Sequence, residues 1–257
     1  MRELILAFLL PACAATAEKK DPQVIFQHGV QSYAAERYGE AIELLERAAE
    51  ARPNRSEYRL WLGRAYGRRA DEMGAWRFWT AISLAKKMRL SLEQAVELDA
   101  ANEDALWDLF GFYLEAPGFV GGGEAKAEAL IKRLAAVKEA SGERAWAQIE
   151  KSRHRLDLAE QRLRRAVELE PGVAGHLSAL AALLAEQGKI DESERLFERA
   201  DELRRNWPDL WLLRARTLIR SGRGKQEARE LLERYLKVEL KPDSEPKSVA
   251  RKLLEEL

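Results

Sequence analysis

The chain has 257 residues, of which 46% are hydrophobic and 33% charged, and its 43 basic and 43 acidic residues cancel to a formal net charge of zero. That balance excludes the bulk attraction to polyanions on which strongly basic proteins depend, so we expect no nucleic-acid partner. Cys13 is the single cysteine, which excludes an intrachain disulfide. Ala, Leu, Glu and Arg dominate the composition, and these strong helix formers indicate an all-α protein.

The first 17 residues have the pattern of a secretory or lipoprotein signal segment. Arg2 precedes an apolar run over residues 4–10, and small residues follow it. Two A-x-A sites permit cleavage after Ala14 or after Ala17. The segment before Cys13 also resembles a bacterial lipoprotein signal, in which Cys13 carries the lipid. We expect a protein exported to the bacterial periplasm or envelope, with membrane attachment only through a lipid on Cys13, and the sequence leaves cleavage and lipidation open.

A period of roughly 34 residues organises the chain from residue 22 onward. In the first unit, Gly29 and Ala41 are small where two antiparallel helices approach each other, and Pro53 ends the second helix. The same frame returns in six units, which predicts six helix pairs. Their expected boundaries are 22–55, 56–102, 103–139, 140–173, 174–207 and 208–240, within a solenoid over 22–240, and a linker with a polar capping helix follows at 241–257.

The signature positions of these units resemble the tetratricopeptide repeat (TPR). Segment 84–130 is also similar to a group of exported bacterial TPR proteins and to the TPR-like domain of the eukaryotic regulator of microtubule dynamics proteins. The residues that match this pattern are Tyr113, Ala116, Pro117, Gly118, Gly121, Gly122, Lys126 and Ala127, whereas Glu115 and Ala100 depart from it. The resemblance implies an α-solenoid of about six TPR-like helix pairs and an interaction role, and it brings no catalytic residues.

Two of the six units contain insertions, and the first lies in the second unit. Trp76, Phe78 and Trp79 give it an apolar surface of its own, and a longer second helix with a short connector fits its length. Residues 55–89 contain nine basic and three acidic residues. Such a patch attracts an acidic partner or anionic lipid; alternatively, its arginines solvate a helix face while their stems cover apolar surface.

The second insertion is a glycine-rich loop in the third unit. Pro117 ends one helix, Gly118 supplies a turn, and Gly121, Gly122 and Gly123 permit positive φ before the next helix begins near residue 124. The spacing of Gly118 and Gly123 fits a phosphate-binding P-loop, but Glu-Ala follows where that motif needs Lys-Ser or Lys-Thr. We therefore predict a structural turn.

Residues for catalysis or metal binding do not cluster in the sequence. His28, His154 and His176 lie in different units, and none belongs to a helical metal motif. His28 stands where a repeat normally has Leu between its helices, so we expect it to be packed. We predict a non-enzymatic protein without catalytic residues, metal or cofactor.

The first helix of each TPR unit lines the concave face of the solenoid, and this placement predicts a partner-binding groove. Aromatic and arginine side chains there suit an extended or helical segment of a protein partner. The candidate groove residues are Phe26, Tyr33, Leu60, Arg64, Arg68, Trp107, Leu114, Gln148, Leu212 and Arg216. Alternatively, Phe26 and Trp107 pack between repeats and the insertions fill the groove. The competing hypothesis is a small-ligand-binding protein or enzyme that uses the 117–123 loop and the aromatic insertion.

Overall fold

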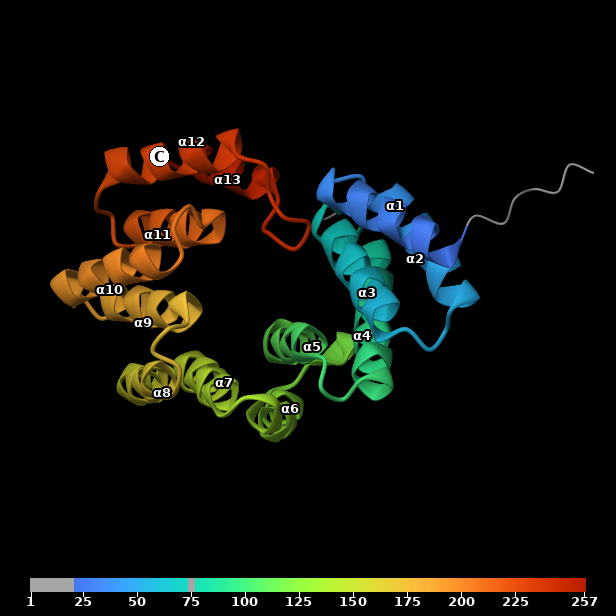
Figure 1. Cartoon of the computed structure of the whole chain (residues 1–257), viewed down its shortest axis with the longest axis horizontal. Coiled ribbons are helices and arrows are strands. Elements are labelled where there is room, and N and C mark those ends of the chain that lie inside the picture. The colour runs from blue at the N-terminus through green and yellow to red at the C-terminus, as the bar shows by residue number, and fades with distance from the viewer. Residues whose placement is uncertain (1–20, 74–76) are drawn as a thin grey trace, which may run out of the picture.

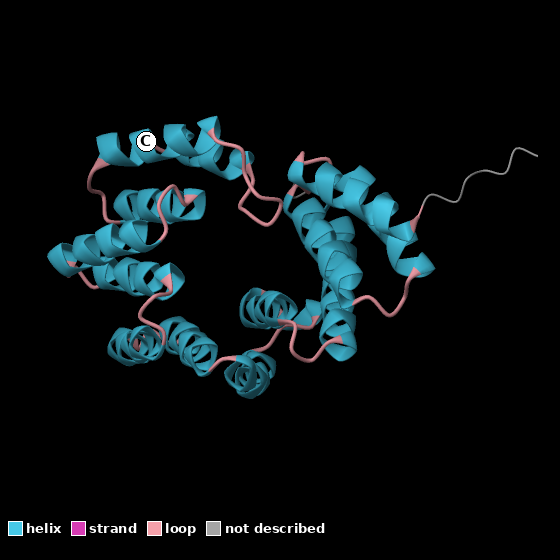
Figure 2. Ribbon diagram, viewed as in Figure 1, coloured by secondary structure: helices cyan, strands magenta, loops and turns pink. Residues whose placement is uncertain are grey.

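In a computed structural model the described residues, 21–73 and 77–257, form thirteen α-helices and a short 3₁₀ helix, and none of them lies in a β-strand (Figure 2). The expected signal segment with Cys13 lies outside the described residues, as does Trp76 of the aromatic insertion. Within residues 21–73 and 77–257, none of the helices combines the length and apolar character that crossing a bilayer requires.

Twelve of the described helices form six consecutive hairpin pairs, and the thirteenth packs on the last pair. The pairs are α1 (Pro22–Ala34) with α2 (Tyr38–Ala51), α3 (Ser56–Asp71) with α4 (Phe78–Leu98), α5 (Glu103–Glu115) with α6 (Glu124–Val137), α7 (Glu139–Ser152) with α8 (Leu156–Leu169), α9 (Ala174–Glu186) with α10 (Ile190–Leu203), and α11 (Pro208–Arg220) with α12 (Lys225–Lys237). The capping helix is α13 (Lys247–Glu255), whose Ala250 is buried against α12. This arrangement confirms the predicted α-solenoid.

Small residues allow the paired helices to approach closely. A Cβ atom added to Gly29 would lie 2.8 Å from Cγ of Leu45, and one added to Gly63 would lie 2.9 Å from Cδ2 of Leu92. Ala41 is fully buried in the same core cluster as Leu45. The small residues of the repeat frame are therefore required by the distance between helices.

His28 does not occupy this interior, and the expectation that it is packed is wrong. It is exposed on α1, while Ile25 and Gly29 of the same helix are buried. The helix therefore turns its neighbouring positions inward and leaves the imidazole in solvent.

Four of the six hairpins use the same tight turn. Each has one residue with positive φ after its first helix, namely Glu36 at 59°, His154 at 58°, Gly188 at 81° and Gly222 at 66°. In each, the next amide donates to a carbonyl five residues earlier, as from Lys189 to Leu184 at 2.8 Å. This left-handed turn suits glycine and is strained for other residues.

The second and third pairs depart from this regular pattern. Helix α4 has 21 residues against 14 in α2, as the insertion predicted. Between α5 and α6 the chain forms the 3₁₀ helix η2 (Gly118–Val120), and Gly121 follows with φ of 104°. A Cβ atom on Gly122 would lie 1.8 Å from the carbonyl oxygen of Ala116. The glycines are thus required by a backbone that folds back on itself, with α6 beginning at Glu124.

The pairs curve into a nearly closed ring outline (Figure 1). Helices α5, α7, α9 and α11 lie on its inner side, while α6, α8, α10 and α12 lie on its outer side. The loop between α12 and α13, residues 238–246, reaches back toward α3 and the first repeats. We call this segment the closing loop.

Candidate binding groove

A cavity of about 520 Å³ lies where the first three helix pairs face the closing loop. Tyr33 of α1, Arg64 and Arg68 of α3, Trp107 of α5 and Asp243 of the closing loop all line it. We call this cavity the groove. Segments separated by more than a hundred residues in sequence thus contribute to one site.

Arg64 is held by carboxylates of α5. Its Nε donates to Oδ2 of Asp108 at 2.6 Å, and its Nη2 lies 3.8 Å from Oδ2 of Asp104. The guanidinium also lies 5.1 Å from the ring centroid of Trp61. Burial alone lowers the pKa of Arg64, but the Asp108 carboxylate outweighs this effect and the net pKa is raised. Arg64 therefore stays charged and joins the second repeat to the third.

Arg68, one turn further along α3, is paired with the closing loop. Its Nη2 lies 3.1 Å from Oε2 of Glu245, and its Nε donates to the hydroxyl of Tyr33 at 3.4 Å. The other oxygen of Glu245 lies 3.8 Å from Nη1 of Arg216 on α11. One carboxylate therefore connects the second repeat with the sixth and closes the ring.

These pairs change the interpretation of the basic segment at residues 55–89. Besides Arg64 and Arg68, three of its basic residues form ion pairs: Arg69 with Glu72, Lys87 with Glu46, and Arg89 with Glu93. The formal excess of positive charge is therefore largely neutralised within the fold. At Arg64 and Arg68 an acidic partner therefore competes with the chain's own carboxylates.

Only some of the predicted groove residues lie together in the structure. Tyr33, Arg64, Arg68 and Trp107 meet at the groove, and Arg216 joins them through Glu245. Leu114 is partly buried against the core of the second to fourth repeats, and Gln148 is partly buried on α7.

Three members of the predicted set lie in the core and do not line the groove, and Tyr33, which does line it, is itself only 7% exposed. Phe26 is 4% exposed and stacks on Tyr58 with ring centroids 4.3 Å apart. Leu60 and Leu212 are 4% and 1% exposed. These side chains support the solenoid and offer no surface to a partner, as the alternative of packing between repeats anticipated for Phe26.

Arg144 of α7 packs on Trp107, which lines the groove, although Arg144 itself does not line the cavity, and the sequence analysis missed it. Its guanidinium lies 4.8 Å from the ring centroid of Trp107, and its Nε is buried without a hydrogen-bond acceptor. Burial lowers the pKa of Arg144. Within residues 21–73 and 77–257 it has no ion pair, unlike Arg64 and Arg68. Its position four residues before Gln148, on one face of the helix, is the signal that would have found it.

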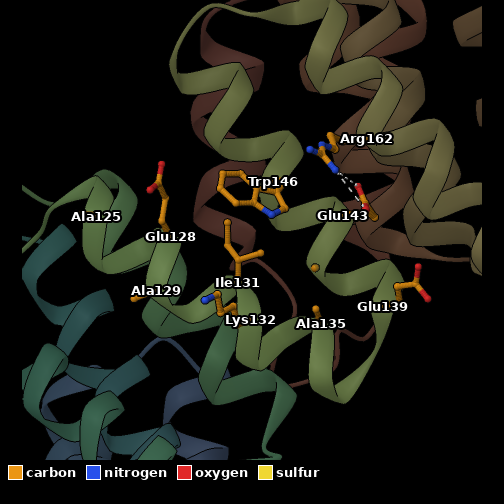
Figure 3. A pocket seen from close by; sticks show the side chains of 11 residues that line it. Ala125, Glu128, Ala129, Ile131, Lys132, Ala135, Glu139, Glu143, Trp146 and Arg162 are labelled. Atoms are coloured by element: carbon orange, nitrogen blue, oxygen red, sulfur yellow. Dashed lines mark hydrogen bonds and ion pairs between the residues drawn. The ribbon is translucent and has the colours of Figure 1, made fainter.

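A second cavity, of about 480 Å³, lies between α6 and α7. Figure 3 shows Ile131 and Trp146 at its floor and an ion pair between Glu143 and Arg162 at its edge. Charged side chains of both signs, including Glu128 and Lys132, line it. Because charges of both signs are mixed in its lining, this cavity does not favour one class of ligand.

The glycine-rich loop carries an exposed aromatic patch. Phe119 of the loop is 61% exposed and lies near Phe78 of α4, with ring centroids 6.5 Å apart, and Trp79 is 80% exposed. Glu124, where a P-loop would place its lysine, forms an ion pair with Arg153 at 2.7 Å. The loop therefore joins the aromatic insertion, as the competing hypothesis requires, but its side chains do not form a phosphate cradle.

Metal-binding chemistry has no support in the described part of the chain. There, no group of three or more His, Cys, Asp or Glu side chains is placed to hold an ion. His176 is buried, and its Nε2 lies 2.8 Å from Oε2 of Glu170, so it takes part in a structural contact.

Comparison with known proteins agrees with this architecture. Residues 152–217 match the sequence model of the tetratricopeptide repeat. The chain is a TPR-like α-solenoid. No curated protein sequence matches it.

Solved TPR structures have the same fold. TTC0263, a thermophilic TPR protein of Thermus thermophilus, is 24% identical with a TM-score of 0.56, over 77% of this chain and 100% of TTC0263. A monomeric IFIT1 mutant with Gppp-AAAA is 18% identical with a TM-score of 0.55, over 91% of this chain and 53% of IFIT1. This TPR-like chain thus spans about half the length of IFIT1, and the likeness shows the fold alone.

Proposed function

We propose that this TPR-like protein is a non-enzymatic scaffold that holds a segment of a protein partner in the groove. The observation that carries the proposal is the groove itself, in which three successive repeats present aromatic and arginine side chains around a cavity of about 520 Å³. Tyr, Trp and Arg anchor protein interfaces because they combine large contact area with directed hydrogen bonds. A curved solenoid supplies the extended surface that such a segment needs.

The charge of the groove favours a protein over a nucleic acid. Arg64 and Arg68 are already paired with Asp108 and Glu245, and Asp71 and Glu115 add further carboxylates to the lining. A polyphosphate chain would be repelled by these acidic groups. A peptide can match charges of both signs, with basic side chains placed opposite Asp71 and Glu115.

Site-specific cross-linking tests the proposal. Gly111 lines the groove, and a Cβ atom added there meets no atom within 4 Å. A photoreactive phenylalanine analogue at this position should therefore be accommodated and should form a covalent adduct with the bound partner. The adduct would be identified by mass spectrometry after irradiation of cell-envelope extract with the purified protein.

Gly39 provides the matched control. It is exposed on α2, and an added Cβ atom there also meets no atom within 4 Å. We expect an adduct from position 111 that is absent from position 39. Equal adducts from both positions would place the partner outside the groove, and adducts from neither would contradict the scaffold function.

We also propose that the protein acts in the bacterial envelope, on the basis of the signal pattern in residues 1–17. The intact mass of the protein from its native cell tests this directly. A chain that begins at Ala15 or Glu18 indicates cleavage and release, and a diacylglycerol increment on Cys13 indicates lipidation. A mass that includes Met1 would contradict export.

The competing function, small-ligand binding at the glycine-rich loop, is supported by the aromatic patch of Phe78, Trp79 and Phe119. Its test is a Phe119→Ala variant, in which the side chain removed is mostly exposed. This variant should retain cross-linking from position 111 if the groove is the functional site. Loss of the adduct would instead implicate the loop.

A further inference from the structure

The closing loop lies at the wall of the groove and pairs with one of the arginines that line it. It has the sequence Glu-Leu-Lys-Pro-Asp-Ser-Glu-Pro over residues 239–246, with no helix or strand. Asp243 lines the cavity, and Glu245 reaches both Arg68 and Arg216. Two carboxylates from the far end of the chain are thus placed among the cations of the inner surface.

The loop is held to its own repeat by the packing of Leu240 against the core of the last repeat and by a few polar contacts. The Tyr235 hydroxyl donates to the carbonyl oxygen of Glu245, and the Ser244 hydroxyl lies 3.4 Å from Oδ2 of Asp209. Pro242 restricts φ and lacks an amide donor, and it lies in a turn in which the Ser244 amide donates to the carbonyl oxygen of Lys241 at 3.1 Å. These features hold the loop in a conformation from which Glu245 can point across the ring.

The ion pair across the ring is suited to exchange. The side chain of Glu245 is 36% exposed and that of Arg68 is 26% exposed, so water screens the contact. Since the pair joins residues 177 positions apart, its release opens the ring without breaking a helix pair. A segment with the same chemistry therefore competes with Glu245 at modest cost.

We propose that the closing loop is an internal ligand of the groove, and that the protein partner carries an acidic, proline-containing segment that displaces Glu245 from Arg68 and Arg216. This inference rests on the proposed scaffold function and names the chemistry of its partner. Arg144, which has no counter-ion among the described residues, lies 4.8 Å from the ring centroid of Trp107, a residue of the groove lining. The displaced loop would leave Arg68 and Arg216 to the carboxylates of the incoming segment.

The test uses the full chain and an acetylated, amidated peptide with the sequence of residues 239–246 as the probe. Binding is followed by NMR titration, with the backbone amide signal of Gly111, which lines the groove and is kept in every variant, as the reporter. We expect the Glu245→Gln chain to bind the peptide at least about fivefold more tightly than the wild type, because its internal competitor is weakened. A second peptide, with Asn for the aspartate and Gln for the second glutamate, should bind neither chain.

Glu239→Gln is the matched control, since Glu239 is exposed in the same loop and does not pair with Arg68. It should bind the peptide as the wild type does, and the double variant Arg68→Gln/Glu245→Gln should lose the gain. Glu245→Ala removes the same carboxylate and should give the same gain, which keeps the test decisive if Glu245→Gln folds poorly. Equal affinities of the wild type and the Glu245→Gln chain, or equal binding of the neutral peptide, would overturn the proposal.

The outcome is separable from that of the scaffold function. If a partner is cross-linked from position 111 but Glu245→Gln does not change peptide binding, the scaffold function is supported. The proposal that the closing loop is an internal ligand is then wrong. If the variants bind the peptide with the expected order of affinities but no partner is cross-linked, the proposed role of the closing loop is supported. The scaffold function is then contradicted.

Discussion

Residues 152–217 and residues 56–123 of this solenoid follow the same repeat frame but differ in how closely they keep to it. The first region matches the tetratricopeptide repeat model, and its hairpin turns at His154 and Gly188 share one geometry. The second contains the long helix α4 and the glycine-rich loop. The groove draws most of its lining from the irregular region and from the closing loop. The regular repeats thus form the solenoid, and the irregular repeats provide most of the residues that line the groove.

The largest expected effect comes from a core residue of the regular region. Phe197→Ala removes a ring that is 1% exposed and should lower the free energy of unfolding by about 3–5 kcal/mol. Because each repeat contacts mainly its neighbours, hydrogen exchange should speed up in α9, α10 and α11 and remain unchanged in α1 and α2. Uniform acceleration along the chain would show that the two regions unfold as one unit.

A smaller effect is expected at the glycine-rich loop. Gly122→Ala forces the backbone to shift, since the new Cβ would lie 1.8 Å from the carbonyl oxygen of Ala116, and should cost about 2–3 kcal/mol. Gly118→Ala is the control, because nothing lies within 4 Å of its added Cβ. Urea denaturation of both variants measures the difference. Equal stabilities would mean that the loop backbone is not fixed as described.

The two regions should also respond to pH with opposite signs. Glu160 of the regular region accepts from Lys189 at 2.6 Å and from Arg164 at 2.7 Å. Burial raises its pKa, but these hydrogen bonds outweigh burial and the net pKa lies below the ordinary 4.5. Its stabilisation is therefore complete above pH 4.5 and is lost as the pH falls through the lowered pKa. The cost of Glu160→Gln, about 1–2 kcal/mol at neutral pH, should shrink in acid.

Asp108 of the irregular region should behave in the opposite way. Burial raises its pKa above the ordinary 3.8 by more than the Arg64 guanidinium lowers it. Its ionised form is therefore disfavoured by folding, and the wild type should gain stability relative to Asp108→Asn as the pH falls through the raised pKa toward 3.8. Urea denaturation between about pH 3 and 7 compares both pairs, and parallel pH profiles would contradict the contrast.

The smallest expected effect concerns the shared hairpin turn. His154→Gly should raise the free energy of unfolding by about 0.5–1 kcal/mol, because His154 has φ of 58° where the equivalent turns at Gly188 and Gly222 have glycine. Thermal denaturation would show a higher midpoint. His154→Ala, which keeps the strained φ with a Cβ atom, is the control and should not stabilise the protein.

The sequence by itself determined the helix pairs and the positions of their close contacts. Gly29, Ala41 and Gly63 are small because paired helices meet there, and such contacts join residues a few turns apart in one hairpin. The lengthened α4 and the reversal at Gly121 and Gly122 also follow from local composition. These features repeat at one period, so a single chain reveals them.

The tertiary structure alone decided which groove residues remain accessible and what neutralises them. Phe26, Leu60 and Leu212 share the periodicity of the groove positions but are buried. Arg64 pairs with Asp108 across 44 residues, and Arg68 pairs with Glu245 across 177. Such pairs depend on the curvature of the whole solenoid, which sums a small rotation at every repeat. No local sequence pattern determines this overall curvature. The repeats could therefore be predicted from the sequence, whereas the closed groove could not.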